Sequence, residues 1–239
     1  MDVNQIASNY QAVLERIAEV ASQAGRDPNR IRLVVVTKGH AITNIRDVIE
    51  AGATRLGENY LEEALEKIST LSAFDQVEWH MIGHVQSRKA KQVCEHFAWV
   101  HSVDRMKIAT RLNSFAAETN RVLPVLLECN VSGEASKFGW NARHEADWQA
   151  RLEDFKTILS LKNLKVTGLM TMAPYYDEPE MARPCFQILR RFQNYLRDHL
   201  ADVTWDELSM GMSGDYEIAI QEGATIVRIG TAIMGPRLV

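Results

Sequence analysis

Short apolar runs alternate with longer amphipathic segments along most of the chain. The apolar runs are four to eight residues long, which is typical of buried strands. Because helical segments separate them, the pattern predicts βαβ units and a parallel sheet. The eight predicted strands are residues 31–37, 54–57, 78–83, 99–102, 124–131, 166–171, 205–210 and 225–230.

Apolar positions at helical spacing fill the intervals between these runs. In the first such segment, Ile6, Tyr10, Val13 and Ile17 predict an amphipathic helix that ends near Gly25. Further helices are predicted at residues 42–51 and 61–68, along apolar stripes that begin at Trp148 and Phe186, and, as the last helix, at residues 215–221 before Gly223.

Eight strands that alternate with helices predict a (β/α)₈ TIM barrel, here with one extra N-terminal helix. A doubly wound open sheet is the alternative arrangement for the same pattern. The sequence contains no Pro/Gly/Ser-rich linker, internal repeat or low-complexity segment. A single domain that spans residues 1–239 is therefore expected.

The composition limits the class of protein. Of the 239 residues, 46% are apolar and 24% are charged, as in ordinary globular domains. The net charge of −4 argues against a dedicated nucleic-acid-binding protein, because such domains carry a basic excess. We interpret the basic stretch at residues 88–91 as a solvated helix face.

The cysteines and the N-terminus bear on the compartment. Cys94, Cys129 and Cys185 are too few and too scattered for a disulfide framework, which favours a reducing environment. Residues 1–5 lack the features of a signal peptide, and no apolar run approaches the roughly 18 residues needed to cross a bilayer. We expect a cytoplasmic protein that does not associate with membranes.

Lys38 follows three consecutive valines at the end of the first predicted strand. Closing a barrel puts the first strand beside the eighth, so Lys38 would meet Gly230 and Thr231 at the C-terminal rim. Barrel proteins often bind phosphate at this place. An amine beside a phosphate site is what a pyridoxal 5'-phosphate (PLP) cofactor requires.

The exit of the seventh strand and the arginine of the eighth add to this prediction. Ser213 is interpreted as the N-cap of the next helix, whose free amides would point at an anion. Desolvation and a nearby cation would lower the pKa of the Lys38 amine and leave a neutral nucleophile. Arg228 lies between Val227 and Ile229, and the sequence leaves open whether it points into the barrel or outward between helices.

Eight blocks in order, one at nearly every strand exit, resemble the YggS/PROSC family of pyridoxal phosphate homeostasis proteins over nearly the whole chain. The blocks are residues 36–38, 57–60, 79–83 with 86–89, 101–105, 130–132 with Lys137 and Gly139, 168–171, 208–213 and 227–231.

The resemblance implies a fold like the N-terminal barrel domain of alanine racemase, a fold-type III PLP protein. It also implies that Lys38 carries PLP as a Schiff base and that Arg228 faces the pyridine nitrogen. The other residues expected to bind the cofactor are Asn59, His80 and Met210 in the pocket lining, and Ser213, Gly230 and Thr231 at the phosphate.

An arginine at the pyridine nitrogen favours a binding role over catalysis. Because arginine stays charged, it keeps the ring nitrogen unprotonated and makes the ring a poor electron sink. Racemisation also needs an acid/base on each face of the substrate. Lys38 can serve one face, but the chain ends eight residues after Thr231, before any second domain. We therefore expect a non-catalytic protein that binds, buffers or delivers PLP in vitamin B6 homeostasis.

Two enzyme alternatives stay open. The first is a fold-type III amino-acid racemase whose second base comes from a partner subunit. The second is a cofactor-free Schiff-base aldolase barrel, with Glu58, Asp104 and Glu128 as candidate acid/base groups. The expected partners are PLP and, as recipients, PLP-dependent apo-enzymes, and the protein is expected to be a monomer.

A metal site is not expected. His80 and His84 have the spacing of a helical zinc pair, but His80 lies in a predicted strand. Four residues of a strand span roughly 13 Å, which is too far for two ligands of one ion.

Overall fold

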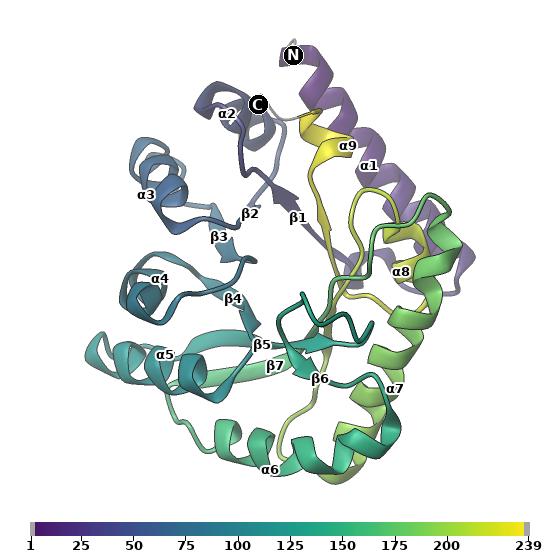
Figure 1. Ribbon diagram of the computed structural model, residues 1–239. Helices are drawn as coiled ribbons and strands as arrows, with labels where there is room; N and C mark the ends of the chain where they lie inside the picture. The colour runs from purple at the N-terminus through teal and green to yellow at the C-terminus, as the bar shows by residue number, and fades with distance from the viewer. Residues whose placement is uncertain (1–2, 237–239) are drawn as a thin grey trace.

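A closed ring of eight parallel strands forms the centre of the molecule (Figure 1). The computed structural model describes residues 3–236. Successive strands pair in parallel, and the pairing of β1 with β9 and of β4 with β5 closes the ring. The strands of the ring are β1 (Arg32–Val36), β2 (Arg55–Glu58), β3 (Glu78–Met81), β4 (Trp99–Val103), β5 (Leu123–Asn130), β7 (Leu164–Met170), β8 (Glu207–Ser209) and β9 (Ile226–Ile229).

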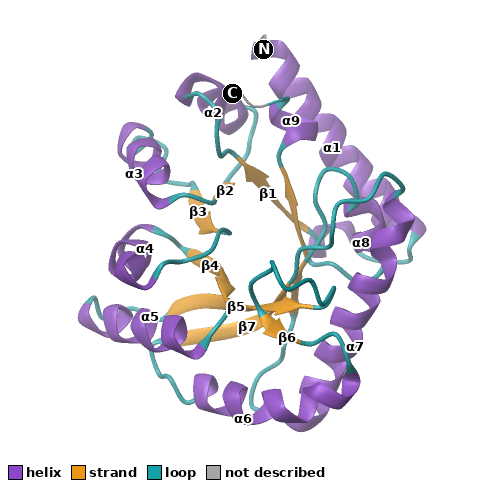
Figure 2. Cartoon of the chain, viewed as in Figure 1, coloured by secondary structure: helices purple, strands orange, loops and turns teal. Residues whose placement is uncertain are grey.

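Helices surround this ring, as the purple helices around the orange strands in Figure 2 show. The short strand β6 (Trp140–Asn141) pairs with β5 outside the ring. The α-helices are α1 (Val3–Gln23), α2 (Ile42–Glu50), α3 (Leu61–Thr70), α4 (Ala90–His96), α5 (Met106–Glu118), α6 (Trp148–Leu159), α7 (Arg183–His199), α8 (Tyr216–Gln221) and α9 (Thr231–Met234).

The predicted TIM barrel with an extra N-terminal helix is confirmed, and the open-sheet alternative is wrong. Each predicted strand overlaps a strand of the ring, because each apolar run is buried on both of its faces. Helix α1 packs beside α2, α8 and α9 and so covers the outside of the β9–β1 junction. Within this contact Asn9 donates to the Ile233 carbonyl oxygen (3.1 Å).

Two predictions about helices need correction. Residues 215–221 are not the last helix, because the four-residue helix α9 follows β9. Ser213 does not cap α8, since its hydroxyl bonds to amides near the start of α9 instead. Helix α9 escapes prediction because four residues are too few to show a helical period.

The barrel has two layers of apolar packing. The larger cluster fills the space between the strands and the surrounding helices. A smaller cluster inside the ring consists of Val34, Leu126, Met170 and Ile226, from four different strands. Because side chains alternate along a strand, residues two positions further on also face the interior. Arg228 and Glu128 therefore lie directly above this inner layer, on the side of the C-terminal rim.

Candidate functional site

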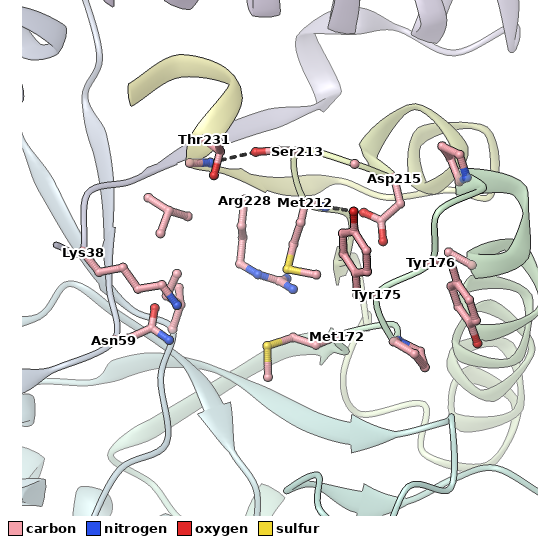
Figure 3. Close-up of a pocket in the computed structure, with 17 residues that line it drawn as sticks. Lys38, Asn59, Met172, Tyr175, Tyr176, Met212, Ser213, Asp215, Arg228 and Thr231 are labelled. Carbon is pink, nitrogen blue, oxygen red and sulfur yellow. Dashed lines mark hydrogen bonds between the residues drawn. The ribbon is translucent and has the colours of Figure 1, made fainter. Parts of the chain in front are cut away.

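A cavity of about 330 Å³ opens where the C-terminal ends of β1 and β9 meet (Figure 3). This volume lies within the range of small-molecule pockets in proteins. The residues that line it are Val36, Lys38, Asn59, Ile82, Met172, Pro174, Tyr175, Tyr176, Pro179, Ala182, Met212, Ser213, Gly214, Asp215, Arg228, Gly230 and Thr231.

Lys38 lies two residues beyond the end of β1, and its side chain extends into the cavity toward Asn59 (Figure 3). Both peptide groups that flank Lys38 are held by α3. The Thr37 carbonyl oxygen accepts a hydrogen bond from Lys67 (2.7 Å), and the Gly39 amide donates to Glu63 (2.5 Å). The backbone position of Lys38 is therefore fixed by hydrogen bonds to α3, one of them buried, on both sides of the residue.

Lys67 is itself buried and paired. Its Nζ contacts Glu58 Oε1 and Glu63 Oε1, each at 2.6 Å, and the Thr37 hydroxyl donates to the same oxygen of Glu58 (2.6 Å). Burial raises the pKa of Glu58, although Lys67 opposes the shift. This cluster of Thr37, Glu58, Glu63 and Lys67, the α3 clamp, ties the ends of β1 and β2 to helix α3.

Opposite Lys38, the ends of β8 and β9 bring a hydroxyl and two amides together. Ser213 Oγ accepts hydrogen bonds from the amides of Gly230 and Ala232, each at 3.3 Å. A Cβ added to Gly230 would come within 3.3 Å of the Val36 side chain, so a glycine keeps this corner open. Amides and hydroxyls grouped in this way suit a phosphate group.

Arg228 points into the barrel, which answers the question that the sequence left open. Its side chain is buried and forms part of the cavity wall. Nη1 donates to Ser209 Oγ (2.6 Å) and Nη2 donates to the Thr171 carbonyl oxygen (2.9 Å). Burial lowers the pKa of Arg228 to about 10, so the guanidinium keeps its charge at neutral pH.

Three lining residues were not expected at the site: Tyr175 and Tyr176 lie in a segment without a sequence prediction, and Asp215, predicted as the first residue of a helix, is the N-cap of α8. Tyr175 and Tyr176 come from the irregular segment between β7 and α7, and Tyr175 is 89% exposed at the cavity mouth. Asp215 is buried and accepts a hydrogen bond from the Met212 amide (2.6 Å). Burial raises the pKa of Asp215. The sequence signal that could have indicated this part of the cavity wall is the pair of adjacent tyrosines after the predicted strand 166–171.

The structure brings together six of the eight residues predicted to bind a cofactor. Those that line the cavity are Lys38, Asn59, Ser213, Arg228, Gly230 and Thr231. His80 and Met210 are buried and lie outside the lining, so the expectation that they line the pocket needs correction. His80 lies within β3 and Met210 directly follows β8, and the sequence pattern alone does not tell which face of the barrel wall such a residue takes.

The candidate acid/base groups of an aldolase also lie outside the cavity lining. Glu58 belongs to the α3 clamp, and Asp104 contacts His84 Nδ1 (2.8 Å) and Arg105 (2.6 Å). Glu128 is buried in the barrel interior, where burial and the neighbouring Asp104 raise its pKa to about 7.

Neither a metal centre nor a membrane-spanning helix is present within residues 3–236. No group of three or more His, Cys, Asp or Glu side chains there is arranged to hold a metal ion. No helix in the same range is long and apolar enough to span a bilayer. The three cysteines are buried and free of disulfides.

The chemical groups that line the cavity match those that PLP binding requires. An amine, a group of amide and hydroxyl donors, and a buried guanidinium face one cavity from three sides (Figure 3). These are the groups needed for an aldehyde, a phosphate and a ring nitrogen, respectively.

Comparison with known proteins agrees with the sequence resemblance. Residues 8–237 match the family model "Alanine racemase, N-terminal domain". A pyridoxal phosphate homeostasis protein of Pseudomonas aeruginosa is 43% identical over 235 residues, which cover 98% of this chain and 97% of that protein.

Solved structures give the same result. PipY of Synechococcus elongatus, solved with PLP bound, is 34% identical, with a TM-score of 0.80 over 93% of this chain and 100% of that one. Alanine racemase from Streptomyces coelicolor shares the fold at 18% identity, with a TM-score of 0.71 over 98% of this chain and 58% of the longer one. The chain therefore belongs to the alanine racemase N-terminal domain family and, within it, to the pyridoxal phosphate homeostasis proteins.

Proposed function

We propose that this protein binds PLP covalently through Lys38 and acts in PLP homeostasis without robust catalysis. The observation that carries the proposal is the single cavity that holds Lys38 on one side and Ser213, Gly230 and Thr231 on the other. Relatives named for PLP homeostasis and the PLP-bound structure of PipY support it.

Each part of the cavity has a proposed role. The Lys38 amine would form a Schiff base with the aldehyde of PLP, which when bound supplies a conjugated ring able to withdraw electrons. Ser213, Gly230 and Thr231 would bind the phosphate through hydroxyl and amide donors. Arg228 would donate a hydrogen bond to the ring nitrogen, and Asn59 would contact the cofactor near Lys38.

Arg228 is the reason for proposing a non-catalytic role. A guanidinium can donate but cannot accept, so the ring nitrogen that faces it has to accept and stay unprotonated. An unprotonated ring stabilises negative charge at the substrate carbon poorly. Binding and release of PLP do not require that stabilisation.

One observation favours a racemase as the second candidate. Tyr175 and Tyr176 line the same cavity as Lys38, and a phenol is one kind of general acid/base. The aldolase alternative receives no comparable support, because Glu58, Asp104 and Glu128 lie outside the lining.

We also propose a compartment, an oligomeric state and partners for the protein. We place it in the cytoplasm as a monomer, with residues 1–239 as one PLP-binding domain. PLP-dependent apo-enzymes would be the recipients of the cofactor. The three buried, unpaired cysteines support a reducing compartment.

The test is an absorbance spectrum of the purified protein with PLP, before and after Lys38→Ala. We expect a visible band at about 420 nm that borohydride bleaches and the substitution abolishes. Peptide mass spectrometry of the reduced protein should then find the pyridoxyl group on Lys38. Lys162→Ala, at an exposed lysine remote from the cavity, is the matched control and should keep the band.

The outcomes separate the candidate functions. A protein that stays colourless with added PLP would contradict PLP binding. A band retained in Lys38→Ala would place the attachment elsewhere. Sustained conversion of an amino acid to its enantiomer, lost in Tyr175→Phe, would make the racemase the better description.

A further inference from the structure

A chain of buried hydrogen bonds runs from Arg228 down through the interior of the barrel. Arg228 Nη1 contacts Ser209 Oγ (2.6 Å), Ser209 Oγ contacts His101 Nδ1 (2.9 Å), and His101 Nε2 contacts His80 Nδ1 (2.9 Å). The four side chains come from β9, β8, β4 and β3 and are all buried. We call Ser209, His101 and His80 the barrel relay.

Arginine sets the direction of these hydrogen bonds. A guanidinium only donates, so Ser209 Oγ accepts from Arg228. Among residues 3–236, Arg228 and His101 are the partners of the Ser209 hydroxyl. If His101 also donated to Ser209, the serine hydrogen would have no acceptor, and a buried donor left unpaired is costly. Ser209 therefore donates to His101 Nδ1.

The same reasoning continues to His80. Because His101 Nδ1 accepts, its Nε2 carries the hydrogen and donates to His80 Nδ1. The hydrogen of His80 is then on Nε2, which lies 3.9 Å from a carboxylate oxygen of Glu78. That distance is too long for a hydrogen bond, so His80 Nε2 has no hydrogen-bond partner within residues 3–236, and either direction of the chain leaves one buried hydrogen unpaired. The negative charge of Glu78 favours an N–H over a lone pair at His80 Nε2, and this decides for the direction that starts at Arg228.

The surroundings of the barrel relay agree with two neutral imidazoles. Burial lowers the pKa of both His80 and His101, and the positive charges of Arg228 and Arg32 add to the effect at His101. Around His80, Glu78 opposes the shift, while Arg55 and Arg32 reinforce it. The His80 ring also stacks on Trp99, with ring centroids 5.8 Å apart, which limits its rotation.

We propose that Ser209, His101 and His80 are positioning residues that orient the Arg228 guanidinium toward the ring nitrogen of the bound cofactor. Both histidines are neutral and carry hydrogen on Nε2. Ser209 and the Thr171 carbonyl oxygen fix one Nη each, which leaves the remaining N–H groups of Arg228 for the cavity. This inference rests on the proposed binding of PLP. It implies that the site prefers a ligand whose ring nitrogen can accept a hydrogen bond from Arg228.

The first test reads the hydrogen positions directly and needs no cofactor. Nitrogen-15 NMR of the histidine-labelled wild-type protein, with assignment by His80→Gln and His101→Gln, reports which ring nitrogen of each histidine is protonated. We expect a protonated Nε2 and a bare Nδ1 at both positions at neutral pH. A protonated Nδ1 on His101, or an imidazolium at either position, would overturn the relay.

The second test compares PLP with its 1-deaza analogue, in which a carbon replaces the ring nitrogen. Wild-type protein should prefer PLP, and Ser209→Ala should reduce that preference about tenfold, roughly the worth of one oriented hydrogen bond. Ser209→Thr keeps the hydroxyl and should keep most of the preference. A merely structural serine would weaken both ligands equally.

The two tests fail in different ways. Wild-type protein that binds neither ligand would contradict the proposed function. The NMR experiment would still show whether the hydrogen positions of the barrel relay are those proposed, because it needs no cofactor. A preference unchanged by Ser209→Ala, with PLP binding intact, would show that Arg228 needs no positioning from Ser209 and overturn the inference.

Discussion

At the scale of single residues, the burial of Glu128 has a consequence for stability. Its carboxyl group lies inside the barrel, where burial and Asp104 raise its pKa to about 7 from an ordinary value of 4.5. Between these two pH values the folded protein holds a proton that the unfolded chain has lost. The stabilising contribution is therefore complete below about pH 4.5 and disappears as the pH rises through 7.

We expect the free energy of unfolding of Glu128→Gln to fall less than that of the wild type between pH 5 and pH 8. The difference between the two proteins over this range should reach about 3 kcal/mol at most. Urea denaturation at several pH values measures it. Glu153→Gln, at a solvent-exposed glutamate, is the control and should follow the wild type. Equal pH dependence in wild type and Glu128→Gln would refute the assignment.

Single residues also mark what the sequence could and could not predict at the site. Lys38, Gly230 and Thr231 were placed together correctly because barrel closure alone joins the first and last strands. His80 was not placed correctly, because its position depends on contacts with His101 and Trp99 across neighbouring strands. No local pattern encodes such contacts.

At the scale of elements, helix α3 acts as the support of the Lys38 backbone. The α3 clamp contains a buried lysine that contacts two carboxylates and the Thr37 carbonyl oxygen. Removing one partner of such a group leaves a buried charge unpaired, which typically costs about 3–5 kcal/mol. The α3 clamp therefore couples the stability of the barrel to the position of the Lys38 amine in the cavity.

Lys67→Met should lower the free energy of unfolding by roughly that amount, about 3–5 kcal/mol, and slow the formation of the visible PLP band. Adding Glu58→Gln should recover part of the stability, because it removes the carboxylate left without its cation. Urea denaturation of the single and double variants forms the required cycle. If the double variant is no more stable than Lys67→Met, Glu58 is not the partner that matters.

The elements themselves were largely predictable. Each predicted strand overlaps a ring strand, because most ring strands contain buried apolar side chains, although polar residues such as Glu58 and His101 lie among them. Helix α5 was not predicted, because two of its buried positions are the small residues Ala109 and Ala116, which weaken the apolar stripe. The segment with Tyr175 has no period at all, so its place at the cavity mouth required the three-dimensional structure.

At the scale of the whole molecule, the cavity lies on the junction that closes the barrel. Lys38 follows β1 and Gly230 follows β9, and these strands pair along the registers from Arg32 with Ile226 to Val35 with Ile229. A ligand that binds both ends of the chain binds the folded barrel and not the unfolded chain. Its binding free energy therefore adds to the stability of the whole protein.

PLP at 100 times its dissociation constant should raise the free energy of unfolding by about 2.7 kcal/mol. Pyridoxal at the same concentration lacks the phosphate and should stabilise less. Thermal denaturation followed by circular dichroism measures both effects. An unchanged melting temperature with saturating PLP would mean that the ligand does not bind across the β1–β9 junction.

The contacts of Ser213 have a consequence for the exchange of ligands. Its hydroxyl occupies the amides of Gly230 and Ala232, which are the donors that a phosphate would use. When a bound anion leaves, the Ser213 hydroxyl can therefore accept the hydrogen bonds of these amides in its place. Neither the occupied nor the empty cavity leaves these amides unpaired, which lowers the free-energy cost of releasing a bound anion.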